Sequence, residues 1–269
     1  MIDAMQPVCD LLSADRKIFL MFRLKGLKIL EDISELSLIP DGKYLINTIN
    51  AYSYTMARRD PLFADALRDG DYLIPDGASI VKACRWISAV SQPRMRIAGW
   101  DLFMYEMRAA EERAAKTARK KVMFVGSSEG VLRLIRERAA MDFPHIEVVT
   151  YSPPYKPVFT PEDDAEIINA INACKPDLLW IGMTAPKQEK WAYSNLGRLD
   201  VCCHIGTIGA VFDFYAGTAK RAPLWWQRHS LEWLYRLIIE PRRMWRRYII
   251  GNIKFLCYIL QEKTTASCC

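Results

Sequence analysis

The stretch KVMFVGSSEGVLRLIRERAAMDF (residues 121–143) places a short apolar run directly before a segment with helical periodicity. The run up to Gly126 is rich in valine and other large apolar residues. From Ser128 onward, apolar residues recur every three or four positions, which is typical of an amphipathic helix. The stretch therefore predicts a buried strand followed by a helix that packs against it.

The same alternation recurs along the chain. Further apolar runs occupy residues 43–50, 71–75, 146–152, 177–183 and 201–207, and amphipathic segments such as 98–120 lie between most of them. The segment 160–177 has a helix-start signature, with Thr160 as the cap and Pro161 in the first turn. Strands that alternate with helices predict an α/β fold, a Rossmann-like and mainly parallel sheet with helices on both faces.

Composition narrows the class of protein. The 269 residues are 51% hydrophobic and 25% charged, the balance of a folded soluble protein. Eight scattered Cys without a CxxC motif, together with only three His, argue against a zinc framework or a disulfide scaffold. We expect no signal peptide, because Asp3 and Asp10 interrupt the start of the chain. The apolar stretch 248–260 contains Asn252 and Lys254 and is too short to span a bilayer.

The net charge of +6 is concentrated in one segment. Between Lys220 and Lys254, nine Lys and Arg face two acids, a net charge of +7, so the rest of the chain carries −1. We therefore predict four parts: an N-terminal extension (1–24), a Rossmann-like catalytic domain (25–217), a basic, aromatic-rich helical appendage (218–262) and a tail (263–269).

Polar residues follow the apolar runs at the points where strands should end. Ligands of parallel sheets bind beyond the carboxyl ends of the strands, so these residues should share one rim. Small, polar or acidic groups delivered there by six segments predict a site for a nucleotide-sized ligand. The residues are Thr48, Asn50, Asp76, Gly126, Ser127, Tyr155, Thr184, Gln188, Gly206 and Thr207.

Each of these signals has a structural alternative when taken alone. Asp76 in the PDG motif is also typical of a turn or a helix cap. Tyr155 could pack a loop, and Gln188 and Glu189 could form a solvated first helical turn. The DGD motif at residues 69–71 resembles a metal-binding D-x-D, but it precedes a strand and so belongs to the wrong end of the sheet. We interpret it as a turn and predict no metal site.

Six motifs taken together resemble a known family. The segments TINA, PDGASIV, RIAGWDL, GMTAPKQEKW, HIGTIGAVFDFYAGTAKRAP and LEWLYRLIIEPRRMWRRY occur in the order and spacing of the bacterial glycosyltransferases named after WecG, TagA and CpsF, glycosyltransferase family 26. The resemblance covers residues 25 to 255. It implies an inverting transferase that needs neither metal nor cofactor. The implied reaction moves an N-acetylhexosamine, its uronic acid or glucose from a UDP-sugar donor to an undecaprenyl-diphosphate-linked acceptor in bacterial surface polysaccharide biosynthesis.

The resemblance also implies roles for single residues. Asp76 would be the general base, which takes the acceptor hydroxyl proton as UDP leaves from the opposite face. Arginines of the appendage would meet the diphosphate charge, since no metal does so. The implied catalytic arginines are Arg236, Arg243 and Arg246, with Pro241 interrupting their helix, and the implied substrate contacts are Thr48, Asn50, Arg96, Tyr155, Gln188 and Asp213, of which Tyr155 and Asp213 would bind uridine.

The appendage suggests a further partner. Its large apolar residues alternate with Arg and Lys, the mixture expected at the surface of an anionic membrane. The apolar set is Trp225, Trp226, Trp233, Trp245, Phe255, Leu256 and Ile259. A basic helix packed on the main domain and a nucleic-acid patch are the alternatives. We predict a membrane partner and no nucleic acid, hence a cytoplasmic protein held peripherally on the inner face of the cell membrane.

Two other classes of function compete with transfer. A dinucleotide-dependent enzyme should carry a G-x-G-x-x-G motif after its first strand, and the chain has none there. A catalytically silent, membrane-bound adaptor on the same fold remains open. The sequence does not identify the donor sugar, because epimers differ by a single hydroxyl.

Overall fold

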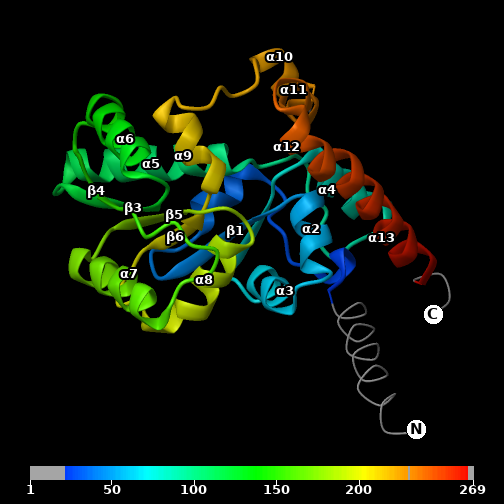
Figure 1. Cartoon of the computed structure of the whole chain (residues 1–269), viewed down its shortest axis with the longest axis horizontal. Coiled ribbons are helices and arrows are strands. Elements are labelled where there is room, and N and C mark those ends of the chain that lie inside the picture. The colour runs from blue at the N-terminus through cyan, green and yellow to red at the C-terminus, as the bar shows by residue number, and fades with distance from the viewer. Residues whose placement is uncertain (1–21, 230, 266–269) are drawn as a thin grey trace, which may run out of the picture.

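A computed structural model of the chain describes residues 22–229 and 231–265. Its centre is one sheet of six parallel strands in the order β2-β1-β6-β5-β3-β4 (Figure 1). The strands are β1 (Tyr44–Ile49), β2 (Tyr72–Pro75), β3 (Lys120–Gly126), β4 (Ile146–Tyr151), β5 (Leu178–Gly182) and β6 (His204–Thr207). Each coincides with an apolar run identified in the sequence, to within one residue at the start of β3, so the predicted α/β fold is confirmed.

Helices cover both faces of this sheet. Along β3, Val122 and Phe124 pack on one face while Met123 and Val125 pack on the other, as the period of two in a strand requires. The first face is covered by α5 (Gly99–Lys116), α6 (Glu129–Asp142) and α9 (Gly209–Ala216), and the second by α7 (Pro161–Cys174) and α8 (Lys187–Asn195) (Figure 1).

The β2 edge of the sheet carries a separate apolar core. It contains residues of α2 (Ala51–Ala57), α3 (Pro61–Arg68) and α4 (Ala78–Trp86). Short 3₁₀ turns occur at η1 (Leu24–Gly26), η2 (Ile33–Leu38) and η3 (Leu196–Arg198). The predicted cap of α7 is present, because the Thr160 hydroxyl accepts a hydrogen bond from the Asp163 amide and the Asp163 carboxylate accepts one from the Thr160 amide. The DGD motif is a turn: Asp71 directly precedes β2, and its carboxylate accepts a hydrogen bond from the Leu45 amide at 2.7 Å.

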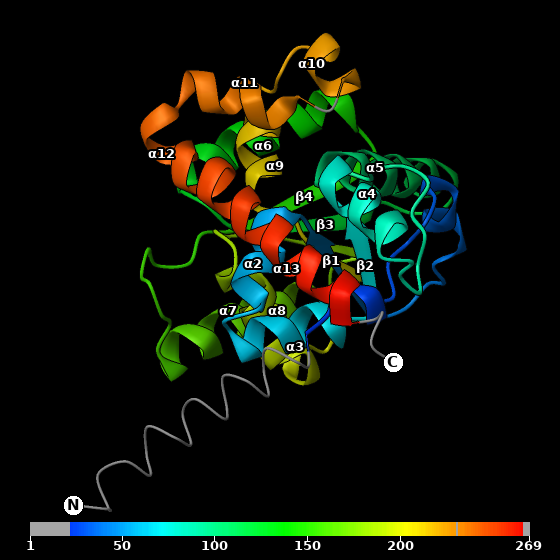
Figure 2. The same cartoon turned by 90° about the vertical axis from the view of Figure 1, so that its right-hand side faces the viewer.

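The C-terminal segment forms an arm that returns to the start of the domain. After α9 ends at Gly217, the chain runs through α10 (Leu224–Arg228), α11 (Glu232–Ile239), α12 (Pro241–Trp245), the π-helical turn η4 (Arg246–Ile250) and α13 (Gly251–Thr265). Figures 1 and 2 show α13 lying along α2, the helix that follows β1. No helix in the described ranges is long and apolar enough to cross a bilayer.

The buried face of α13 corrects one sequence prediction. The sequence predicts that Phe255 and Ile259 lie at a membrane surface, yet they are 3% and 1% exposed and pack in the core formed with α2 and α4. Periodicity alone could not reveal this, because α13 is apolar on two sides. The predicted extension (1–24) falls outside the described residues up to residue 21, and the predicted tail (263–269) does so from residue 266.

A buried polar cluster fastens the end of α13. The Glu262 carboxylate accepts hydrogen bonds from the amides of Leu24 and Lys25, each at 3.0 Å. It also accepts one from the Tyr54 hydroxyl and pairs with the Arg58 guanidinium at 3.3 Å. Both members of the ion pair have side chains that are 2% exposed. The cluster therefore joins the two ends of the described chain to α2.

Replacement of Glu262 tests this attachment. Glu262→Ala leaves Arg58 as a buried charge without its carboxylate and removes the acceptor of two backbone amides, so the free energy of unfolding should fall by about 3–5 kcal/mol. Urea denaturation measures the change. The neighbouring and exposed Gln261→Ala serves as the control. Equal stability of the two variants would show that the cluster contributes nothing to docking.

Candidate functional site

The ends of β1 and β2 place three of the predicted site residues side by side. The Asp76 amide donates to the Ile49 carbonyl at 2.9 Å, which ties the residue after β2 to the end of β1. Thr48 is paired with Ile74 across the two strands. Asn50 follows directly as the cap of α2, its side-chain oxygen accepting from the amides of Tyr52 and Ser53 at 3.0 Å each.

The PDG turn holds Asp76 beyond the end of its strand. Gly77 has φ +148°, a backbone conformation that residues with a side chain rarely adopt. No group of the described residues donates a hydrogen bond to the half-buried Asp76 carboxylate. Asp76 is therefore not a helix cap, and its carboxylate is held without a local hydrogen-bonding task.

Charges from several elements act on Asp76. Burial raises the pKa of Asp76 to about 6, and the negative charges of Glu232 and Asp101 act in the same direction. The positive charges of Arg96 and Arg247 oppose this rise in the pKa. The carboxyl thus has a pKa close to neutral pH, which suits a group that takes up a proton during a reaction.

Arg96 connects this region to the appendage. Its neighbour Ile97 donates to the Pro75 carbonyl at 3.0 Å, so Arg96 lies beside the end of β2. The Arg96 guanidinium pairs with Glu232 of α11, and Glu232 also accepts from Arg221 at 3.3 Å. Glu232 therefore binds the appendage to the domain beside Asp76, a role that no motif of the sequence indicates.

Gln188 and Glu189 lie at the ends of β5 and β6. They are 4% and 2% exposed, which excludes the alternative of a solvated helical turn. The Gln188 side-chain oxygen accepts from the amides of Met183 and Gly209 at 3.1 Å each, and its amide nitrogen donates to Glu189 at 2.9 Å. Most of the hydrogen-bonding capacity of Gln188 is used within the protein. Its side chain joins the residue after β5, the start of α9 and the first turn of α8.

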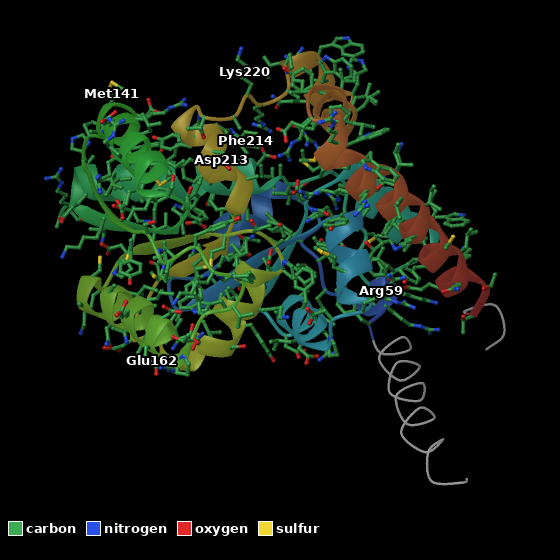
Figure 3. All side chains as sticks on the ribbon, in the orientation of Figure 1. Arg59, Met141, Glu162, Asp213, Phe214 and Lys220 are labelled. Atoms are coloured by element: carbon green, nitrogen blue, oxygen red, sulfur yellow. The ribbon has the colours of Figure 1, made fainter. Side chains whose placement is uncertain are left out.

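The remaining predicted contacts lie farther along the sheet. Tyr155 is fully exposed in the loop after β4. Since β4 and β2 are opposite edges of a six-stranded sheet, about 24 Å separates these edges at the usual strand spacing. Asp213 is exposed on α9, below the segment that leads through Lys220 into the appendage (Figure 3). Tyr155 is therefore distant from Asp76, whereas Asp213 lies on a helix that packs against β5.

The appendage arginines take different positions. The Arg236 guanidinium lies 5.4 Å from the centre of the Phe214 ring of α9. Arg246 is exposed and lies over Trp245, whereas Arg247 is partly buried against Tyr52 of α2, 5.2 Å from the ring centre. The side chain of Arg243 lies outside the described residues. Arg247, to which the family resemblance gave no role, is the arginine of the π-helical turn whose charge acts on Asp76.

In the ranges 22–229 and 231–265, no three His, Cys, Asp or Glu side chains gather in a way that could hold a metal ion.

The raised pKa of Asp76 makes a prediction for stability. The folded state holds the proton more tightly than an unfolded carboxyl, whose pKa is about 4, so ionisation of Asp76 lowers the free energy of unfolding as the pH rises from about 4 to about 6. Asp76→Asn should therefore stabilise the protein at pH 8, by up to about 3 kcal/mol, and have little effect at pH 4. Denaturation at both pH values measures this, with the exposed Asp200→Asn as control. A gain independent of pH would contradict it.

Comparisons with known proteins identify the family of the chain. The chain is 33% identical over 211 residues to an N-acetylglucosaminyldiphosphoundecaprenol N-acetyl-β-D-mannosaminyltransferase of Bacillus spizizenii, covering 78% of this chain and 76% of that protein. Proteins of the same name from Bacillus subtilis and Staphylococcus aureus are 28% and 25% identical, and each alignment covers at least 75% of both chains. Residues 17–268 match the glycosyl transferase WecG/TagA/CpsF family. The chain therefore belongs to the WecG/TagA/CpsF family of glycosyltransferases.

Proposed function

We propose that this glycosyltransferase moves a sugar from a UDP-sugar to a polyprenyl-diphosphate-linked acceptor, with inversion at the transferred carbon and without a metal ion. The observation that carries the proposal is Asp76, a carboxyl with a pKa of about 6 at the carboxyl end of β2, close to the charges of Arg96 and Arg247. The named relatives transfer N-acetylmannosamine to an N-acetylglucosaminyl-diphosphoundecaprenol, which supports the acceptor class and makes that sugar the first donor to test.

The proposed mechanism uses one carboxylate as a base and several cations. Asp76 takes the acceptor hydroxyl proton while that oxygen attacks the sugar carbon and the bond to UDP breaks on the opposite face. The departing diphosphate gains negative charge, which guanidinium groups can stabilise through paired hydrogen bonds. Among the described residues, Arg96 and Arg247 are cations whose charges act on Asp76. Arg236, Arg243 and Arg246 remain proposed additions to this set, and Thr48, Asn50, Tyr155, Gln188 and Asp213 remain proposed substrate contacts.

The Arg96–Glu232 ion pair affects how the proposed substrate would bind. A diphosphate that binds Arg96 must compete with the Glu232 carboxylate. Release of Glu232 would also remove one of the negative charges that raise the pKa of Asp76. The bound diphosphate, however, brings more negative charge to Arg96 than Glu232 takes away, so substrate binding raises the pKa of Asp76 and favours uptake of the acceptor proton.

The exposed side of the appendage supports a membrane partner. Ile249, Ile253, Leu256 and Leu260 are 46–57% exposed, and their spacing of four, three and four places them on one side of the helix, opposite Phe255 and Ile259. Leu224, Trp225 and Trp245 are also exposed, as are the cations Arg228, Arg242 and Arg246. An apolar stripe beside cations suits the interface of an anionic bilayer. We therefore propose a peripheral position on the inner face of the cell membrane, with no nucleic-acid partner.

A transfer assay tests the proposed reaction. The wild-type chain should release UDP from UDP-N-acetylmannosamine, or from another member of a UDP-sugar panel, only when a lipid-diphosphate N-acetylglucosamine is present. This release should persist in excess EDTA. Asp76→Asn should retain UDP binding and lower turnover by about two orders of magnitude or more, because the positioned base is lost. Asp200→Asn should behave as wild type.

Three results would each contradict a different part of this proposal. Near-normal turnover of Asp76→Asn would remove the base assignment. Loss of activity in EDTA that Mn²⁺ restores would overturn metal independence. A wild-type chain that binds anionic vesicles but transfers no sugar from any donor would favour the silent adaptor.

Vesicle flotation tests the membrane surface. Replacing Ile253, Leu256 and Leu260 by Gln should weaken binding to anionic vesicles by at least about tenfold, because three apolar side chains no longer enter the interface. The matched control replaces Leu38, Val90 and Met141, which are 71–76% exposed on other elements, by Gln. Equal binding of the two triple variants would show that the α13 stripe is not the docking surface.

A further inference from the structure

Glu189 is a buried acid that the proposed chemistry leaves without a task. It lies in the first turn of α8, and its side chain is enclosed where β5 and β6 end. One carboxyl oxygen accepts the Gln188 hydrogen bond, whereas the other, Oε2, is buried and has no hydrogen-bond partner among the described residues. A buried polar atom without a partner costs stability, so a chain rarely keeps one without a functional reason.

Arg247 carries a buried hydrogen-bond donor that lacks a partner in the same way. Its Nε is also buried without a hydrogen-bond partner in the described part of the chain. The guanidinium carbon lies 5.2 Å from the centre of the Tyr52 ring and 5.7 Å from that of Tyr248. Its positive charge acts on the carboxyls of both Glu189 and Asp76. A buried donor and a buried acceptor of opposite charge thus face the same region from the appendage and from the domain.

Close packing determines where Arg247 lies. Gly251 is four residues farther along, and a Cβ atom at this position would lie 3.1 Å from the Tyr52 ring, so only glycine allows this approach of the appendage to α2 without displacement. On the other side, Gln188 fixes the Glu189 carboxyl, because its own oxygen is held by two backbone amides. The backbone near Arg247 and the Glu189 carboxyl are therefore each held in place by their own element.

We propose that Glu189 is a positioning residue for the reaction: it holds the Arg247 guanidinium of the appendage in the site, beside Asp76 and directed at the diphosphate of the donor. The role at the diphosphate rests on the proposed function, whereas the pairing itself does not. In the structure the two groups act on each other by charge without a hydrogen bond. The pair closes when the substrate fills the site, and Glu189 then accepts from Arg247.

The pairing can be tested without any substrate. Burial raises the pKa of Glu189 to about 7, the Gln188 hydrogen bond and the Arg247 charge lower it, and no other charged side chain of the described residues has a comparable effect on it. In protein with ¹³C-labelled glutamate, the carboxyl signal that Glu189→Gln removes should therefore titrate near neutral pH. Arg247→Gln should move its midpoint upward, because a stabilising cation is lost, while the exposed Arg242→Gln should not. An unchanged midpoint in Arg247→Gln would overturn the pairing.

The role in transfer is tested by a double-mutant cycle. Glu189→Gln and Arg247→Lys should each lower kcat/KM by about tenfold or more, with the loss mainly in kcat. The kcat/KM of the double variant should lie within about twofold of that of the less active single variant. Glu189→Asp should recover part of the loss. Effects that multiply in the double variant would overturn the positioning role.

The two experiments separate the inference from the function on which it rests. If the wild-type chain transfers no sugar from any UDP-sugar, the proposed function fails, and the carboxyl titration still decides whether Glu189 and Arg247 interact. If the wild type is active but the cycle is additive, the inference alone fails. Circular dichroism and thermal unfolding of each variant identify any loss of fold.

Discussion

The buried contact of Glu262 with Arg58 and Tyr54 is the interaction on which the geometry of the site depends. It fastens the last turns of α13 to α2 and to the first described residues of the domain. The same α2 begins at Asn50, at the end of β1, and carries Tyr52 against Arg247. A cluster distant from Asp76 in the sequence thus sets the position of the arginine whose charge acts on that residue.

Two opposing demands meet at the carboxyl ends of the strands. A carboxyl that takes up a proton near neutral pH needs a raised pKa, which burial and Glu232 supply. The proposed diphosphate substrate would need cations close by, and these lower the same pKa. The structure balances the two with acids and arginines from both parts of the chain, since Glu232 and Arg247 come from the appendage whereas Asp101 and Arg96 come from the domain. The proton affinity of Asp76 therefore depends on the docking of the appendage.

Much of the fold follows from the sequence, because the periods of strands and helices are local properties. The six apolar runs became six parallel strands, and the polar residues after β1 and β2 meet as expected. The contacts of the appendage were less predictable. Glu232 acts through an ion pair with Arg96, which is 136 residues away in the sequence. Glu189 is buried only because other segments pack over it, and its local sequence would equally suit an exposed helical turn. No local pattern separates the buried Phe255 from the exposed Leu256, since α13 is apolar on two sides.

The break in the appendage helix explains why neighbouring arginines differ. Pro241 begins a new helix after α11, and the π-helical turn Arg246–Ile250 then takes more residues per turn than an α-helix. Arg247, Gly251 and Phe255 are spaced by four and face α2, so the buried side of α13 continues into the turn. Arg246 is rotated away and exposed beside Trp245. One helix can thereby present a cation to the site and, from the adjacent position, another cation to an anionic surface.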